Sequence, residues 1–145
     1  MLQLFCTCQA LNESTEAGYK PHKTPIFVDV DASEAFRQWR ASQCMTLTRT
    51  RTQSGGYYVT SLDRRLTTAE MLKLQGVVPE NIGDTRGIPT REINASIGNA
   101  MSACVLERIL PRVAWVTGHL PGVQPPRDEW SDPNFVAKGG RFQQQ

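Results

Sequence analysis

The sequence contains few side chains that could hold a metal ion. Its 145 residues include four cysteines and two histidines. No two cysteines have the CxxC spacing of a structural zinc site, and only His22 and His119 could assist them as ligands. We therefore expect no metal site, and we expect free thiols in a reducing compartment.

Long hydrophobic runs are also missing. No segment approaches the roughly 20 apolar residues of a transmembrane helix. Residues 1–11 are mildly apolar, but they lack the basic leading region of a signal peptide. These absences predict that the protein has no membrane partner. They favour an intracellular protein, in the nucleus if the organism is a eukaryote and in the cytoplasm otherwise.

Lysine is absent from residues 35–65, a segment that contains six arginines and one acid, Asp63. The first 34 residues contain five acids. The net charge is only +2, so the distribution of charge is more informative than its sum. Arginines without lysine suit contact with phosphates or with the edges of bases. A solvated protein surface would have the same composition.

The length of the chain predicts a single domain. A hydrophobic fraction of 39% is low for a compact domain, so the polar ends are expected to contribute little to the core. Residues 1–24 carry little pattern and are interpreted as an irregular segment. Residues 119–145 are rich in proline, glycine and glutamine, which predicts a disordered tail.

Residues 26–30 form a short run of β-branched and aromatic residues that predicts a strand. Residues 32–40 have apolar side chains at positions 35, 36 and 39, a helical spacing over two turns.

Residues 46–53 alternate in the manner of a strand, with threonines on one face and Arg49 and Arg51 on the other. The glycines at 55–56 allow a turn, and residues 57–60 have the composition of a returning strand. The pattern predicts a β-hairpin with arginines projecting from one face. An edge hairpin with solvated arginines would have the same pattern.

A well-capped helix is predicted after the hairpin. Thr67 and Glu70 have the spacing of a capping box, in which each side chain bonds a free backbone amide of the first turn. Gly76 fits the left-handed residue that ends a helix, and Pro79 fits a stop.

Residues 90–110 form a second helical region. We expect a short helix, a tight turn at Gly98 and Asn99, and a longer helix from Ala100 that ends or bends at Pro111. The apolar residues of this region fall on one stripe, which places Cys104 among buried, unreactive thiols: Ile93, Ile97, Met101, Cys104, Val105 and Ile109.

Together these pieces resemble the last two sequence blocks of DNA cytosine-5 methyltransferases. The penultimate block of that family reads roughly Arg-x-Leu-Thr-Pro-Arg-Glu-x-x-x-Leu-Gln-Gly-Phe-Pro, and the residues here that match it are Arg64, Leu66, Thr67, Glu70, Leu74, Gln75 and Gly76. The final block reads Gln-x-Gly-Asn-Ala/Ser-Val before an apolar helix, and the residues that match it are Gly98, Asn99 and Ala100.

The family's target-recognition domain tends to close with a Thr-Leu pair and then a Gly-Gly-Tyr strand, which here are Thr46, Leu47, Gly55, Gly56 and Tyr57. The resemblance covers about residues 44–113. The chain departs from the family pattern where Thr68 and Ala69 replace Pro-Arg, where Ser96 replaces Gln, and where Met101 replaces Val.

The resemblance implies an α/β parent fold, the Rossmann-like fold of methyltransferases that use S-adenosyl-L-methionine. This chain would be its mixed α+β C-terminal portion, with a β-hairpin and two or three helices. Residues 25–63 would end the target-recognition domain, and residues 64–118 would be the last helices of the catalytic domain.

The resemblance also implies site residues. Asn99 and Met101 would approach the methionine end of the cofactor, since free amides at a helix start suit a carboxylate; alternatively, Asn99 is only a helix cap. Arg49 and Arg51 would face double-stranded DNA and contact phosphates or guanine edges. Glu70 and Arg64 would be structural, Glu70 as a cap and Arg64 as a brace between domains.

The residues that perform the family's chemistry are not found in this sequence. The nucleophilic cysteine of the family lies in a Pro-Cys-Gln loop, and no cysteine here follows a proline. Glu80, Asn81 and Ile82 resemble the catalytic Glu-Asn-Val segment, but they follow the penultimate block, where the family has a connecting loop. We therefore expect no catalytic residue in this chain.

The leading hypothesis is thus the C-terminal part of a DNA cytosine-5 methyltransferase, inactive alone and partnered by an upstream catalytic portion. That portion would come from the same gene or from a separate chain. An alternative is a non-catalytic DNA-binding or regulatory module derived from such an enzyme. A third is a structural remnant, whose last helix would lack its parent sheet and expose an apolar stripe.

Overall fold

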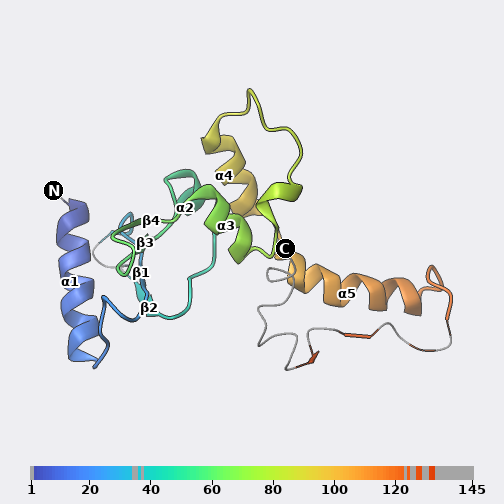
Figure 1. Ribbon diagram of the computed structural model, residues 1–145, viewed down its shortest axis with the longest axis horizontal. Helices are drawn as coiled ribbons and strands as arrows, with labels where there is room; N and C mark the ends of the chain where they lie inside the picture. Colours follow the sequence, from blue (N-terminus) through green and yellow to red (C-terminus); the bar gives the residue numbers. More distant parts are fainter. Residues whose placement is uncertain are drawn as a thin grey trace.

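The computed structural model in Figure 1 places a β-sheet between helix α1 and the group formed by helices α2, α3 and α4, while helix α5 extends away from both. The structure describes residues 2–33, 36, 38–122, 124, 127, 128, 131 and 132. The elements of these residues, in chain order, are α1 (Leu2–Glu16), β1 (Ile26–Val28), β2 (Trp39–Ala41), α2 (Arg49–Gln53), β3 (Tyr58–Val59), β4 (Arg64–Arg65), α3 (Thr68–Leu74), the 3-10 helix η2 (Pro79–Asn81), α4 (Thr90–Asn99) and α5 (Ala103–Val116).

The sheet has four short strands in the order β2-β1-β3-β4, and each neighbouring pair is antiparallel. Phe27 of β1 lies opposite Arg40 of β2 on one side and Val59 of β3 on the other. Because successive strand residues point to opposite faces, Ile26 and Val28 face one layer of helices and Phe27 faces the other.

Each face of the sheet has its own hydrophobic cluster. The cluster beneath α1 consists of Ala10, Ile26, Val28 and Val30, with Trp39, Ala41 and Tyr58 beside it. The cluster beneath the other helices consists of Leu47, Tyr57, Val59, Leu66, Met71, Leu72 and Ile97. Full burial of such side chains contributes roughly 1.5–3 kcal/mol each, so these two clusters are the main stabilising feature of the described fold.

The prediction that residues 1–24 are irregular is wrong, because residues 2–16 form α1. The end of this helix is polar, but the Ser14 and Thr15 hydroxyls both donate to the Leu11 carbonyl within the helix. Ala10 and Ser14, four residues apart, are both fully buried. Packing against β1 therefore stabilises a helix that the composition alone does not indicate.

The predicted strand at residues 46–53 is also wrong, because α2 occupies its second half. Thr52 is fully buried, and its hydroxyl donates to the carbonyls of Thr48 and Arg49, so a threonine that favours strands is satisfied inside a helix. The hairpin of the structure is formed by β3 and β4 instead. The returning strand predicted at residues 57–60 is confirmed as β3, with β1 and β4 as its partners.

The capping box at the start of α3 is confirmed. The Thr67 hydroxyl accepts from the Glu70 amide, and the Glu70 carboxylate accepts from the Thr67 amide. Gly76 follows the helix with a φ of 77°, the left-handed conformation predicted for it. Pro79 then begins η2 rather than a loop.

The second helical region is confirmed as two helices, but the break lies later than predicted. Asn99 is the last residue of α4, and Ser102 stands at the N-cap position of α5, so Asn99 caps neither helix. The helix does not end at Pro111, since Leu110 and Pro111 lie inside α5; the alternative of a bend there stays a prediction. The single apolar stripe is therefore divided: Ile97 is buried in the core, whereas Met101 is 61% exposed.

Two other predictions concern segments that the structure describes only in part. The helix predicted at residues 32–40 is wrong at its end, where β2 begins at Trp39; residues 34, 35 and 37 lie outside the described residues. Most of the tail predicted at residues 119–145 also lies outside them. The domain boundaries and the Rossmann-like parent fold stay predictions.

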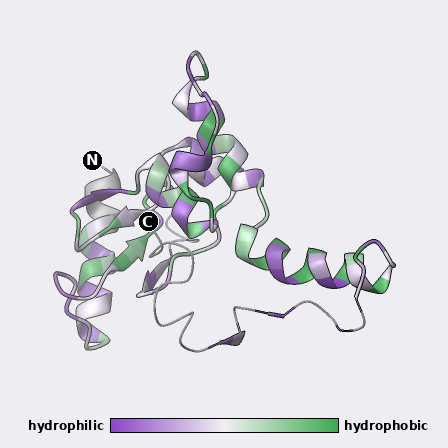
Figure 2. Cartoon of the chain, turned by 45° about the vertical axis from the view of Figure 1, so that its right-hand side comes forward, coloured by the Kyte–Doolittle hydropathy of each residue, from purple (hydrophilic) through white to green (hydrophobic). Residues whose placement is uncertain are grey.

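Helix α5 stands apart from the sheet and the other helices in both views (Figures 1 and 2), and hydrophobic residues are distributed along its length. None of its described side chains is buried. Its exposed apolar residues are Val105, Ile109, Leu110, Val113 and Val116. The charged face of α5, which includes Arg108 and Arg112, contacts Asp128. Arg108 bonds the Asp128 carboxylate at 2.9 Å, and Arg112 lies 3.6 Å from the same group.

Candidate functional site: the surface around the α4–α5 turn

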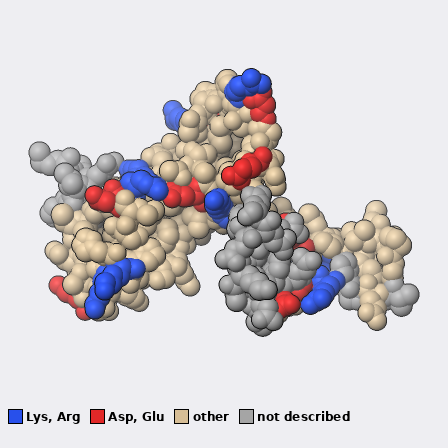
Figure 3. Space-filling model, viewed as in Figure 1, with Lys and Arg blue, Asp and Glu red and all other residues tan. Residues whose placement is uncertain are grey.

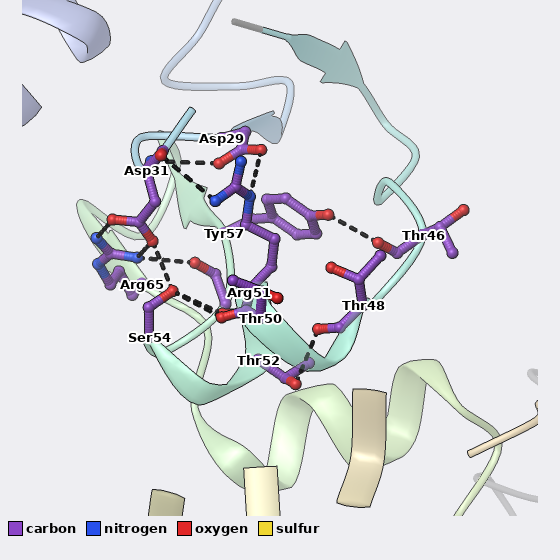
Figure 4. Close-up of polar contacts among 11 residues, drawn as sticks. Asp29, Asp31, Thr46, Thr48, Thr50, Arg51, Thr52, Ser54, Tyr57 and Arg65 are labelled. Carbon is purple, nitrogen blue, oxygen red and sulfur yellow. Dashed lines mark hydrogen bonds and ion pairs between the residues drawn. The ribbon is translucent and has the colours of Figure 1, made fainter. Parts of the chain in front are cut away.

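Two aspartates and two arginines form a charged network beside the sheet, which we call the Asp–Arg network (Figure 4). Arg65 forms a two-pronged ion pair with Asp31, with N–O distances of 2.7 and 2.8 Å. Arg51 donates from Nε to Asp29 at 2.7 Å. The Ser54 hydroxyl also donates to Asp31, at 2.7 Å. The network thus ties the loop after β1 to α2 and β4.

The charges of this network stabilise one another. The hydrogen bonds from Arg65, with further help from Ser54 and Arg51, lower the pKa of the Asp31 carboxyl against the opposing effect of burial. The pairing with Asp31 in turn raises the pKa of the Arg65 guanidinium. Because the network contains two acids and two bases, it adds little net charge to the surface.

Arg51 is therefore engaged inside the chain. Its guanidinium is bonded to Asp29 and to the Asp31 carbonyl, and its side chain is only 26% exposed. Its proposed contact with DNA would require this pair to open. Arg49, by contrast, is exposed and has no ion-pair partner among the residues that the structure describes.

A second ion pair joins β4 to α3. Arg64 binds both oxygens of Glu70 at 2.8 Å. This bond, together with the amide and hydroxyl of Thr67, lowers the pKa of Glu70 to about 2. Glu70 therefore has the capping role predicted for it. The predicted brace between domains by Arg64 is not tested, and here Arg64 serves this local pair.

Figure 3 shows the consequence of this pairing on one face of the molecule, where most basic side chains lie beside acidic ones instead of gathering in one patch. The pairs include Arg86 with Asp84 and the contacts of Arg108 and Arg112 with Asp128.

An open pocket of about 790 Å³ lies between α2, the end of α3 and the α4–α5 turn. Residues 43–49 form one wall, and the opposite wall includes Gln75, Gly98, Ala100 and Ser102. A volume of this size is in the range of small-molecule sites. Arg49 lines the pocket and brings a positive charge to it.

The predicted cofactor residues lie on the same turn. Asn99 and Met101 are exposed, and they alternate with Gly98, Ala100 and Ser102, which line the pocket. The turn thus presents one set of positions to the pocket and the other set to solvent at its edge. Arg49 and the predicted cofactor segment are neighbours in space, whereas Arg51 belongs to the Asp–Arg network.

The wall of the pocket is held in place by a buried tyrosine. The Tyr57 hydroxyl donates to the Thr46 carbonyl at 2.7 Å, and the side chain of Tyr57 is 4% exposed. Burial is the main cause that raises the pKa of this phenol to about 12. The Thr-Leu pair and the Gly-Gly-Tyr strand of the sequence are thus joined directly.

Glycines allow three further close contacts between the matching pieces. A β-carbon on Gly56, which has a φ of 71°, would lie 2.8 Å from the Met71 sulfur. A β-carbon on Gly76 would lie 2.5 Å from the Cys104 sulfur, and one on Gly98 would lie 2.5 Å from the Arg49 amide. The contact of Gly98 is with backbone atoms and requires a residue without a side chain, whereas Gly56 and Gly76 also have the positive φ that favours glycine.

Sequence reasoning missed two groups of residues in this region. Asp29 and Asp31 entered the sequence reasoning only as part of the acid count. In the structure they pair with Arg51 and Arg65, so these two arginines are not free to bind an external anion. Gln75 was counted only as a match to the family pattern, although its side chain bonds the carbonyls of Ile97 and Ala100. An excess of acids before an arginine-rich segment was the signal for the first group.

The cysteine that lines the pocket lacks the surroundings of a reactive thiol. Burial raises the pKa of the Cys44 thiol, which lines the pocket, to about 11. Cys104 is partly buried at the start of α5, and Cys8 is exposed. In the described part of the chain, no three metal-binding side chains come together. None of the helices described combines the length and the hydropathy of a membrane crossing.

Comparison with protein-family models, with curated proteins and with solved structures finds no match to the chain.

Proposed function

We propose that this chain is the C-terminal part of a DNA cytosine-5 methyltransferase, an enzyme that transfers a methyl group from S-adenosyl-L-methionine to C5 of cytosine. The observation that supports this best is that every matching piece of the sequence contacts another one. Tyr57 bonds Thr46, Gly56 packs on Met71, and Gln75 bonds Ala100.

In this function the chain would support the active site structurally, while the catalytic residues would lie in the upstream portion of the enzyme. The catalytic cysteine would come from an upstream portion, since no cysteine here lies in a Pro-Cys-Gln loop. The target cytosine must leave the base stack to be reached. The chain would contribute to the surface that receives the DNA and would close one side of the cofactor pocket.

The exposed face of α5 supports the need for an upstream partner. An amphipathic helix is normally stabilised by burial of its apolar face, and here Ile109 and Val113 are about half exposed. We assign this face to the sheet of the catalytic portion. The charged side of the same helix, with Arg108 and Arg112, is already occupied by Asp128.

The residues around the α4–α5 turn fit one wall of a cofactor site. When bound, S-adenosyl-L-methionine supplies the methyl group. Asn99 and Met101 are exposed on the turn, and Thr46, Thr48 and Ser102 line the adjacent pocket. The amide of Asn99 can bond a carboxylate, and Met101 can cover an apolar part of a ligand. The chain supplies no Gly-rich loop for the rest of the cofactor.

Arg49 is the arginine that we assign to DNA. It is exposed, it lies at the edge of the pocket, and no acid of the described chain neutralises it. A contact with a phosphate oxygen needs only such a free guanidinium. For Arg51 we propose a role in the Asp–Arg network first, and a contact with DNA only if that network opens.

The test is complementation. The purified chain is mixed with the upstream catalytic portion of a cytosine-5 methyltransferase, and transfer of tritiated methyl groups into DNA is measured. We expect incorporation only from the mixture. Methyl transfer by the isolated chain, or a mixture as inactive as its parts, would contradict the proposal. The same function implies an intracellular protein, in the nucleus of a eukaryote or the cytoplasm of a bacterium.

A non-catalytic DNA-binding module is the second candidate, and the observation that favours it is the free cation at Arg49. Its binding would weaken as the salt concentration rises. An electrophoretic shift assay with duplex DNA at two salt concentrations tests it. Absence of salt-sensitive binding would count against this candidate and would leave complementation as the deciding measurement for the first.

A further inference from the structure

Gln75 makes three hydrogen bonds to the segment that connects α4 and α5. Its side-chain Nε2 donates to the carbonyls of Ile97 and Ala100, at 3.1 and 3.3 Å. Its own carbonyl accepts from the amide of Ala103 at 2.7 Å. A single residue at the end of α3 thus bonds both ends and the middle of this turn.

These bonds lie where helices leave backbone groups without their regular partners. The Ile97 carbonyl, near the end of α4, accepts from the Ala100 amide as well as from Gln75, and the amide of Ala103, the first residue of α5, has the Gln75 carbonyl as its acceptor. Ser102, at the N-cap of α5, makes no side-chain capping bond. Gln75 supplies partners at both helix ends, and the absence of a side chain at Gly76 lets this point of the chain approach Cys104 closely.

We infer that Gln75 is a positioning residue, which fixes residues 99–101 in the conformation that presents Asn99 and Met101 to a ligand. This inference rests on the proposed function, in which these residues meet S-adenosyl-L-methionine. The bonds of Gln75 go to Ile97, Ala100 and Ala103, so Asn99 and Met101 stay free of them. Residues of the penultimate sequence block thereby set the geometry of the final block.

These contacts give a structural reason for the presence of Gln75 and Gly76 after α3 together with Gly98 and Asn99 at the end of α4. Gln75 anchors the turn from the side of α3, and Gly98 seats it against α2. A shorter side chain at position 75 would not reach across the gap. A carboxylate of the same size could not donate the two bonds.

The deciding experiment compares Gln75→Glu and Gln75→Leu with wild type in the full chain. Amide hydrogen exchange is measured by NMR without any ligand. We expect exchange at Ala100 and Ala103 to accelerate about ten-fold, which corresponds to the loss of one to two hydrogen bonds. Exchange at Met71, inside α3, should not change. Gln53→Glu is the matched control, because Gln53 has no side-chain bond among the described residues.

Two results would overturn the inference. One is unchanged exchange at Ala100 and Ala103 in both Gln75 variants. The other is equal acceleration at Met71, which would make Gln75 a residue of general stability and not one that positions the turn.

A second arm separates the inference from the proposed function. The labelled chain is titrated with S-adenosylhomocysteine, and the amide signals of Asn99 and Met101 are followed. We expect both signals to shift in wild type, with an affinity about five-fold weaker in Gln75→Glu, a typical size for coupling between two sites. Absence of any shift in wild type would count against the cofactor role of the turn, whereas the exchange measurement would still decide the role of Gln75.

Discussion

Gly98 of α4 packs directly against Thr52 of α2, and no side chain fits between them. A β-carbon at position 98 would collide with the Thr52 hydroxyl, and it would also lie 2.5 Å from backbone atoms of Thr48 and Arg49. Backbone atoms cannot move aside as a flexible side chain can. The glycine of the final block is therefore required by helix packing, independently of any ligand.

Gly98→Ala is expected to lower the free energy of unfolding by about 1–3 kcal/mol, the usual cost of overpacking. The measurement is urea denaturation followed by circular dichroism. Gly83→Ala is the matched control, because a β-carbon there would meet nothing within 4 Å. Its effect should stay within about 0.5 kcal/mol. Equal stability of the two variants would show that α2 and α4 are not in contact.

Arg49→Ala and Arg51→Ala are expected to affect different properties of the chain, although the two residues are only two positions apart. Loss of Arg51 leaves Asp29 without its partner, which should cost about 1–3 kcal/mol of stability. Loss of Arg49, which is exposed, should change stability by less than about 0.5 kcal/mol but lower the affinity for DNA. Thermal unfolding and a fluorescence binding assay measure both quantities for both variants. Equal stability losses would contradict the Asp–Arg network.

Glu70 should make stability depend on pH in the acid range. Its pKa is about 2 in the folded chain, against an ordinary value of 4.5, so its pairing stabilises the fold above pH 4.5. That contribution is lost as the pH falls from 4.5 toward 2. Urea midpoints measured between pH 5.5 and 2.5 should therefore fall less steeply in Glu70→Gln than in wild type. Glu80→Gln controls for the loss of one charge, and parallel curves for wild type and Glu70→Gln would contradict the prediction.

The apolar face of α5 should make the isolated chain associate with itself. The double change Ile109→Glu and Val113→Glu is expected to give a monodisperse chain in size-exclusion chromatography, because it removes an exposed apolar stripe. The same variant should fail in complementation with the catalytic portion. Arg112→Gln, on the charged face, is the control and should complement. Full complementation by the double variant would exclude this face as the docking surface.

Cys44 should react slowly with thiol reagents. Its pKa of about 11 leaves about one thiolate in a thousand at pH 8, and burial adds a barrier to access. Exposed Cys8 should be labelled before Cys44. Iodoacetamide labelling with peptide mapping by mass spectrometry gives the order. Labelling of Cys44 before Cys8 would show that residues 43–47 do not pack as described.

The elements that local chemistry determines could be predicted from the sequence. The box of Thr67 and Glu70 depends on groups three residues apart, and the left-handed conformation of Gly76 depends on the absence of a side chain. The strand predicted at residues 26–30, found at 26–28, and the division of the region predicted at residues 90–110 into two helices follow from equally local patterns.

The wrong predictions concern segments whose conformation depends on distant partners. The threonines of residues 46–53 alternate as in a strand, but α4 packs against this segment, and Thr52 finds its acceptors inside a helix. Residues 2–16 become helical where Ala10 can be buried on β1. In the site, Arg51 is not a free cation because it pairs with Asp29, which lies 22 residues earlier in the chain. The spacing of residues in the sequence cannot reveal such a pair.

The Asp–Arg network and the Arg64–Glu70 pair finally limit how many salt ions residues 35–65 could displace from a nucleic acid. Of the six arginines in residues 35–65, Arg51, Arg64 and Arg65 are already neutralised by acids of the same chain. Arg37 lies outside the described residues, so Arg40 and Arg49 are the two described arginines of this segment without such an acid. Two phosphate contacts correspond to a slope of only about −1.8 in a plot of log affinity against log salt. Firmer attachment to DNA would therefore have to come from basic residues outside this segment or from a partner, and residues 35–65 would orient a complex held by those other charges.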